Sequence, residues 1–165
     1  MRILVYGAGV LGCTLARDFF KVGKDVTLLA RGKWAETIKT NGLCIKNYVL
    51  PMKSTVRVPV VTELASEDEY DVIFVAARYT QVATILDALR ANKSKNVVFL
   101  GNNVQPEKLV TALPEKNVMF AFASSAGHRE QDRVVSVDLK KITIGQLCGA
   151  QSDEQLMQKI FAGTG

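Results

Sequence analysis

Short apolar runs alternate with segments of helical periodicity along the first two thirds of the chain. The apolar runs are rich in aliphatic and β-branched side chains, as in strands buried on both faces of a parallel sheet. They span residues 2–6, 25–30, 71–76, 96–100 and 117–123. The segments between them carry apolar side chains at helical spacing, which predicts helices over residues 11–22, 34–42, 80–91 and 106–113. This alternation predicts an α/β domain with a mostly parallel sheet.

Three other parts of the chain depart from this alternation. Residues 42–50 and 54–62 resemble a strand pair, which we expect to lie outside the main parallel sheet. Residues 133–137 and 140–145 predict two further strands that form a hairpin. Residues 152–161 predict a last helix with Ser152 as its N-cap. Its apolar face carries Leu156, Ile160 and Phe161, and we expect this face to lack a partner.

Length and composition indicate one globular domain. The chain has 165 residues, of which 48% are hydrophobic and 22% charged. No apolar run approaches the ~18 residues that cross a bilayer, and glycines interrupt the apolar start too early for a signal peptide. The three cysteines, Cys13, Cys44 and Cys148, fit neither a zinc spacing nor a disulfide framework. We therefore expect buried thiols, no metal site and a cytoplasmic location.

The net charge of +5 is spread along the chain rather than gathered in one block. Nucleic-acid-binding proteins concentrate basic residues on one face and place aromatic residues among them. A small ligand that carries phosphate needs only a few local cations. The charge permits both classes of ligand, but nucleic-acid binding rests on the charge alone, and we expect no nucleic-acid partner.

The segment GAGVLG places Gly7, Gly9 and Gly12 at the spacing G-x-G-x-x-G, between a predicted strand and a predicted helix. In this context the first glycine allows a sharp turn, the second lets a diphosphate approach the backbone, and the third lets the helix pack on the sheet. The N-terminus of the helix then attracts the phosphate charge. The motif predicts dinucleotide binding by a Rossmann-type fold with a doubly wound sheet, whereas a purely structural turn needs only one of the glycines.

The end of the second predicted strand indicates which dinucleotide is bound. NAD-binding proteins place a carboxylate there for the ribose 2′-hydroxyl. This chain has Ala30 followed by Arg31, with Lys33 nearby. A guanidinium matches the geometry of phosphate and stacks on flat rings, so Arg31 predicts NADP(H), with the arginine on the 2′-phosphate and the adenine. The alternative is that Arg31 is a solvated surface charge.

These motifs together resemble the N-terminal half of the ketopantoate reductase (2-dehydropantoate 2-reductase) family. The likeness is carried, in order, by MRILVYGAGVLGCTLA, LLARGKWAETIKTNGL, DVIFVAARYTQV, VVFLGNNVQPEKL and VVSVDLKKITIGQ. The glycine motif is common to many dehydrogenases, but the set in this order is more specific. The resemblance spans nearly the whole chain and implies that residues 1–165 form an NADP(H)-binding domain.

The resemblance also implies a set of site residues. The expected cofactor-binding residues are Gly7, Ala8, Gly9, Val10, Leu11, Gly12, Arg31, Ala77, Arg78, Gln81 and Asn102. Asn102 is in addition the catalytic candidate, because it falls on the family asparagine near the nicotinamide and substrate.

Three features depart from the family pattern. Arg78 stands where the family usually has lysine, and Gly101-Asn102-Asn103 replaces Gln-Asn-Gly. The resemblance also implies a second, mostly helical domain with a catalytic lysine and a substrate-binding glutamate, and we expect residues 1–165 not to include it. The only histidine, His128, is expected to be a solvated loop residue.

The function implied by the resemblance is an NADPH-dependent reduction of a 2-keto acid: ketopantoate to pantoate, in pantothenate and coenzyme A biosynthesis. We expect the isolated domain to bind cofactor and to turn over poorly. The expected ligands are NADP(H) and a small-molecule 2-keto acid, with no membrane partner and with a homodimer left open. The alternative is a stand-alone NADP(H)-sensing or regulatory module without catalysis.

Overall fold

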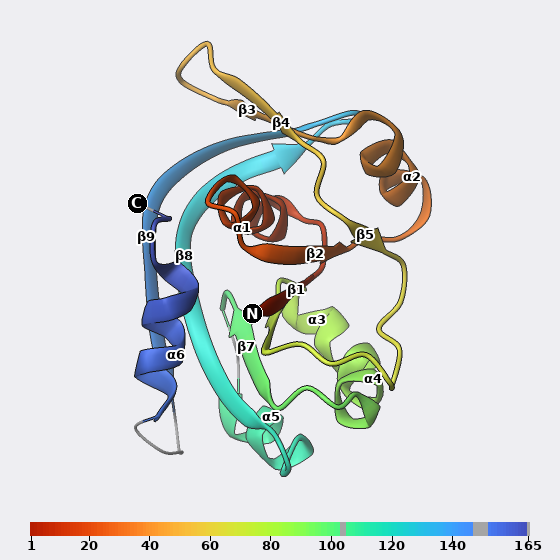
Figure 1. The fold of residues 1–165 in the computed structure, drawn as a ribbon, viewed down its shortest axis with the longest axis vertical. Coiled ribbons are helices and arrows are strands. Elements are labelled where there is room, and N and C mark those ends of the chain that lie inside the picture. Colours follow the sequence, from red (N-terminus) through yellow and green to blue (C-terminus); the bar gives the residue numbers. More distant parts are fainter. Residues whose placement is uncertain (103–104, 147–151, 165) are drawn as a thin grey trace.

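The computed structural model describes residues 1–102, 105–146 and 152–164, which form one nine-stranded sheet with helices packed against it (Figure 1). The strands are β1 (Arg2–Tyr6), β2 (Asp25–Leu29), β3 (Leu43–Asn47), β4 (Lys53–Val56), β5 (Val60–Val61), β6 (Val72–Val75), β7 (Asn96–Leu100), β8 (Asn117–Arg129) and β9 (Val134–Gln146). The helices are α1 (Val10–Lys21), α2 (Gly32–Asn41), α3 (Tyr79–Val82), α4 (Leu86–Ala91), α5 (Pro106–Ala112) and α6 (Ser152–Phe161), with a 3₁₀ turn, η1 (Ala83–Ile85).

The strand order confirms the expected Rossmann-type fold. Across the sheet the order is β4-β3-β9-β8-β7-β6-β1-β2-β5. Its part β5-β2-β1-β6-β7-β8 is parallel throughout and has the strand order of dinucleotide-binding folds. The direction of winding reverses between β1 and β6. In such folds a ligand binds outside the carboxyl ends of the strands at this reversal.

The hairpin near the end of the chain is longer than the sequence predicts. The strands expected over residues 133–137 and 140–145 are one strand, β9, which pairs antiparallel with β8. The pairing shifts register between Ala123 and Ser125 on β8. Through this shift β9 stays paired with β8 on both sides of the segment that separates the two predicted strands. His128 therefore lies in a strand, and the expectation that it lies in a loop is wrong.

The predicted strand pair over residues 42–50 and 54–62 is partly correct. Strands β3 and β4 are antiparallel, but β3 also pairs with β9, so both belong to the main sheet. Residues 60–61 form β5, which pairs with β2 at the opposite edge. Pro59 has no N–H to donate to a ladder, and it ends the three-residue link from β4 to β5.

This short link brings the two edges of the sheet close together. The four Cα steps from Val56 to Val60 span at most about 14 Å. The sheet consequently curls around α1, which contacts β1, β2, β3, β4, β8 and β9 (Figure 1). Phe19 of α1 is fully buried at the centre of this arrangement.

A second core lies on the other face of the sheet, where α3, α4 and α5 cover β1, β6 and β7. It contains Leu4, Ile73, Leu89, Phe99 and Leu113. The single helix predicted over residues 80–91 is interrupted here by η1. Thr84 and Ile85 in this turn are β-branched and disfavour a regular helix, and the Thr84 hydroxyl donates to the Gln81 carbonyl at 2.7 Å.

The apolar face of α6 packs against the core, contrary to the expectation that it lacks a partner. Ile160 is fully buried, and the ring of Phe161 lies 5.2 Å from Phe19 and 5.7 Å from Phe74. The capping role expected of Ser152 depends on a side chain outside the described part of the structure. Cys13 and Cys44 are buried, as expected, and Cys148 lies outside the described residues.

No helix among the described residues has both the length and the apolar character required to cross a bilayer.

Replacing Ile160 with alanine tests the docking of α6. We expect Ile160→Ala to lower the free energy of unfolding by about 2–5 kcal/mol, because it leaves a cavity in the core. The matched change Lys159→Ala, at an exposed position of the same helix, should shift it by no more than about 0.5 kcal/mol. Urea unfolding of the three proteins measures both values, and equal effects would show that α6 is not docked.

Candidate functional site

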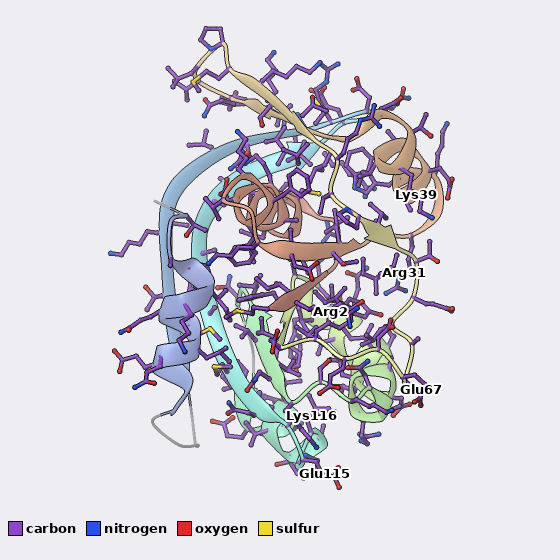
Figure 2. All side chains as sticks on the ribbon, viewed as in Figure 1. Arg2, Arg31, Lys39, Glu67, Glu115 and Lys116 are labelled. Carbon is purple, nitrogen blue, oxygen red and sulfur yellow. The ribbon has the colours of Figure 1, made fainter. Side chains whose placement is uncertain are left out.

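A cleft of about 800 Å³ opens at the carboxyl ends of β1, β2 and β6, where the strand order reverses. The ends of β1 and β2, the turns after the three strands, α2, α3, η1 and the end of β8 supply its lining. The lining includes Gly7–Val10, Ala30, Arg31, Trp34, Ala76–Arg78, Gln81, Thr84, Ile85 and Gly127–Arg129, together with Tyr6 and Leu29. In Figure 2 the Arg31 side chain lies between α2 and the α3–α4 segment.

Gly7 and Gly12 hold the first turn together by close backbone contact. Gly7 has a φ of +113°, and a Cβ built on it would lie 2.6 Å from the Ala76 carbonyl oxygen. A Cβ on Gly12 would lie 1.9 Å from the Gly7 carbonyl oxygen. No side chain fits at either position, so these two glycines set how closely α1 approaches β1 and β6.

Gly9 differs from its two neighbours because its Cα faces open space. A Cβ built there meets no atom within 4 Å. Gly9 is the N-cap of α1, and no side chain caps this helix. No side chain therefore shields the free N–H groups of the first turn, which lie at the positive end of the helix dipole. This arrangement fits the approach of a diphosphate.

Arg31 follows β2 and is exposed in the cleft. Its Nη2 donates a hydrogen bond of 3.2 Å to the Tyr6 hydroxyl, and its guanidinium carbon lies 5.7 Å from the centre of the Tyr6 ring. The side chain is thus directed across the carboxyl ends of β1 and β2. The cleft contains no carboxylate or lysine among its described lining residues, so its charged groups are cationic.

The turn after β6 supplies Ala77, Arg78 and Gln81. Arg78 is exposed and is the N-cap of α3. Its backbone N–H donates to Gln81 Oε1 at 3.4 Å, and the Gln81 N–H donates to the Arg78 carbonyl at 2.8 Å. These contacts fix the start of α3. Arg78 lines the cleft beside the glycine turn.

Leu11, Gly12 and Asn102 do not line the cleft, although the sequence placed them in the cofactor site. Gly12 lies beneath the turn, and Leu11 borders a smaller hollow of about 80 Å³ between α1, β8 and α6. Asn102 is exposed directly after β7, at the same edge of the sheet. Asn103 lies outside the described residues.

Trp34, His128 and Arg129 line the cleft and were not assigned to it from the sequence. Trp34 Nε1 donates to the Ala8 carbonyl at 3.0 Å, which ties α2 to the glycine turn. His128 and Arg129 come from the end of β8, more than a hundred residues away along the chain. The sequence offers no local signal for this, because the length of β8 alone carries them to the cleft.

Burial sets the protonation state of the Cys13 thiol beside this site. It raises the pKa of Cys13, on the first turn of α1, to about 12, although a hydrogen bond with Trp34 and the charge of Arg129 act in the opposite direction. The thiol is therefore neutral and unreactive at physiological pH. Among the described residues, no group of three His, Cys, Asp or Glu side chains could hold a metal ion.

Residues 3–149 match the family model described as ketopantoate reductase PanE/ApbA. A curated relative, the uncharacterized oxidoreductase YkpB of Bacillus subtilis (strain 168), is 27% identical over 170 residues, which cover 99% of this chain and 55% of the relative. The chain therefore spans about half the length of this relative.

Solved structures share the fold. The 2-dehydropantoate 2-reductase from Methylococcus capsulatus superposes with a TM-score of 0.81 at 22% identity, over 100% of this chain and 55% of that one. A D-mandelate dehydrogenase, solved with NADH and anilino(oxo)acetate, gives a TM-score of 0.82 at 19% identity, over 99% of this chain and 55% of its own.

Alanine at two of the glycines should separate packing from ligand access. Alanine normally favours a helix interior over glycine by about 1 kcal/mol. We nevertheless expect Gly12→Ala to destabilise the protein by about 3 kcal/mol or more, because its methyl group meets the Gly7 carbonyl. Gly9→Ala should cost about 1 kcal/mol or less. Thermal and urea unfolding measure the stability of both variants. A Gly12→Ala protein as stable as wild type would contradict the packing role of Gly12.

Proposed function

The chain belongs to the ketopantoate reductase family, and on this premise we propose that it binds NADP(H) as the cofactor-binding part of a 2-keto acid reductase. The observation that carries the proposal is one cleft in which an open glycine turn and an exposed arginine face the same space. The two groups match the two phosphate-bearing parts of NADPH, its diphosphate and its 2′-phosphate.

The backbone of Gly7, Ala8, Gly9 and Val10 is proposed to hold the diphosphate at the N-terminus of α1. Ala77, Arg78 and Gln81 would border the dinucleotide from the neighbouring turn. Gly12 and Leu11 would act from outside the cleft, Gly12 by allowing α1 to approach. When bound, the nicotinamide supplies the hydride that reduces a carbonyl group.

Arg31 supports NADP(H) over NAD(H). A 2′-phosphate carries negative charge, and a guanidinium forms short, charge-assisted hydrogen bonds with it. The described lining of the cleft offers no carboxylate to accept hydrogen bonds from a 2′-hydroxyl. The D-mandelate dehydrogenase of similar fold was solved with NADH, so the preference has to be carried by individual residues of this cleft.

The reaction of the whole protein is a further part of the proposal. We take ketopantoate as the substrate, NADPH as the hydride donor and pantoate as the product, which places the reaction in pantothenate and coenzyme A biosynthesis. Asn102, exposed after β7, would help to position the reacting groups. Membership of a reductase family favours this activity over a regulatory module. A cytoplasmic location and the absence of nucleic-acid and membrane partners remain part of the proposal, and a homodimer stays open.

Removal of the Arg31 guanidinium tests the cofactor preference. Wild-type protein should bind NADPH more tightly than NADH, and Arg31→Ala should weaken NADPH binding about tenfold while leaving NADH nearly unchanged. Arg57→Ala removes the same charge from an exposed position outside the cleft and should change neither affinity. Calorimetric titration measures all six dissociation constants, and equal wild-type affinities for NADPH and NADH would refute the preference.

Ketopantoate reduction by the chain as it stands is expected to be very slow. The described lining of the cleft contains neither a lysine nor a carboxylate to move the proton that accompanies hydride transfer. The measurement is NADPH oxidation followed at 340 nm with and without ketopantoate, at protein concentrations that saturate in the binding assay. Turnover at the rate of an ordinary reductase, on the order of 10 s⁻¹, would contradict this expectation.

A further inference from the structure

Arg129 at the end of β8 occupies a defined position in the cleft. Its guanidinium carbon lies 5.4 Å from the centre of the Trp34 ring, so the two flat groups are in contact. Trp34 is largely buried, and its Nε1 is bonded to the Ala8 carbonyl. An exposed arginine is thereby held over a ring that is itself fixed to the glycine turn.

The charge of Arg129 is available for a ligand. Among the described residues its guanidinium forms no ion pair. The adjacent Glu130 instead contacts Arg133 at 2.9 Å and His128 at 3.5 Å. An arginine without a carboxylate partner, in a cleft whose described lining has no acidic group, favours an anion.

The surroundings of Arg129 indicate which part of a ligand it meets. Its charge acts on the Cys13 thiol, in the first turn of α1, and its supporting ring is bonded to Ala8 within the turn itself. Arg31, in contrast, is bonded to Tyr6 at the end of β1. The two arginines therefore rest on different aromatic side chains, Arg129 on Trp34 and Arg31 on Tyr6.

We propose that Arg129 is a cofactor-binding residue that contacts the diphosphate of the dinucleotide, with Trp34 as the positioning residue beneath it. The proposal rests on the proposed dinucleotide-binding function and extends it to a residue outside the glycine motif. Arg129 would supply a charged side-chain donor beside the backbone N–H groups at the N-terminus of α1. Arg31 remains the residue for the 2′-phosphate.

The test measures how substitutions of Arg129 and Arg31 change the affinities for NADH and NADPH. Because NADH and NADPH share the diphosphate, Arg129→Ala should weaken both by the same factor, about tenfold, and ADP-ribose equally. Arg31→Ala should weaken NADPH alone. Arg129→Lys keeps the charge but loses the planar stacking and the paired donors, so about threefold weakening is expected. Arg133→Ala, which removes a charge from the same hairpin outside the cleft, should have no effect.

Trp34 provides a direct signal because it is the only tryptophan in the chain. Energy transfer from Trp34 to the reduced nicotinamide reports the binding of NADH and NADPH. Circular dichroism verifies that each variant is folded. Unchanged affinities of a folded Arg129→Ala protein would overturn the inference and leave the proposed function intact. A loss confined to NADPH would also overturn it, because Arg129 would then serve the 2′-phosphate. Wild-type protein that binds neither dinucleotide would overturn the proposed function together with this inference.

Discussion

The contact between the backbone of Gly7 and the Cα of Gly12 is the constraint on which the site depends. With a Cβ at Gly12 placed 1.9 Å from the Gly7 oxygen, α1 could not begin where it does. Its N-terminus would move away from β1, and the open backbone at Gly9 would no longer face the cleft. The positive φ of Gly7 serves the same geometry, because it turns the chain off the strand within one residue.

The charges of the cleft complement this turn. Arg31 and Arg78 follow β2 and β6, and Arg129 is the last residue of β8. All three line one cleft, without a carboxylate among the described lining residues. The cations come from side chains, whereas the contacts expected from the glycine turn come from the backbone. A site built in this way separates general affinity for a dinucleotide, which needs the turn, from discrimination between dinucleotides, which needs individual arginines.

Much of the architecture could be predicted from the sequence, because buried parallel strands and the glycine turn leave strong local patterns. Strand β1, the start of α1 and the position of Arg31 all follow from the first 31 residues. The sequence-based prediction failed for elements whose length or position depends on the strand or helix that they pack or pair with. The continuous strand β9, the separation of β4 from β5 and the docking of α6 depend on residues distant in the sequence. Arg129 was missed for the same reason, since β8 reaches the cleft only because its pairing with β9 extends it to Arg129.

The link at residues 57–59 has a consequence for how the protein can respond to a ligand. It joins the two edges of the sheet, so the sheet cannot flatten or widen around α1 unless β4 or β5 is first detached. The same enclosure surrounds α1, which contacts six of the strands. The α3–η1–α4 segment, an interrupted helix on the other face of the sheet, lies outside this enclosure. Arg78, Gln81 and Thr84 of that segment also line the cleft, so its displacement would reshape one wall while the glycine turn stays stationary.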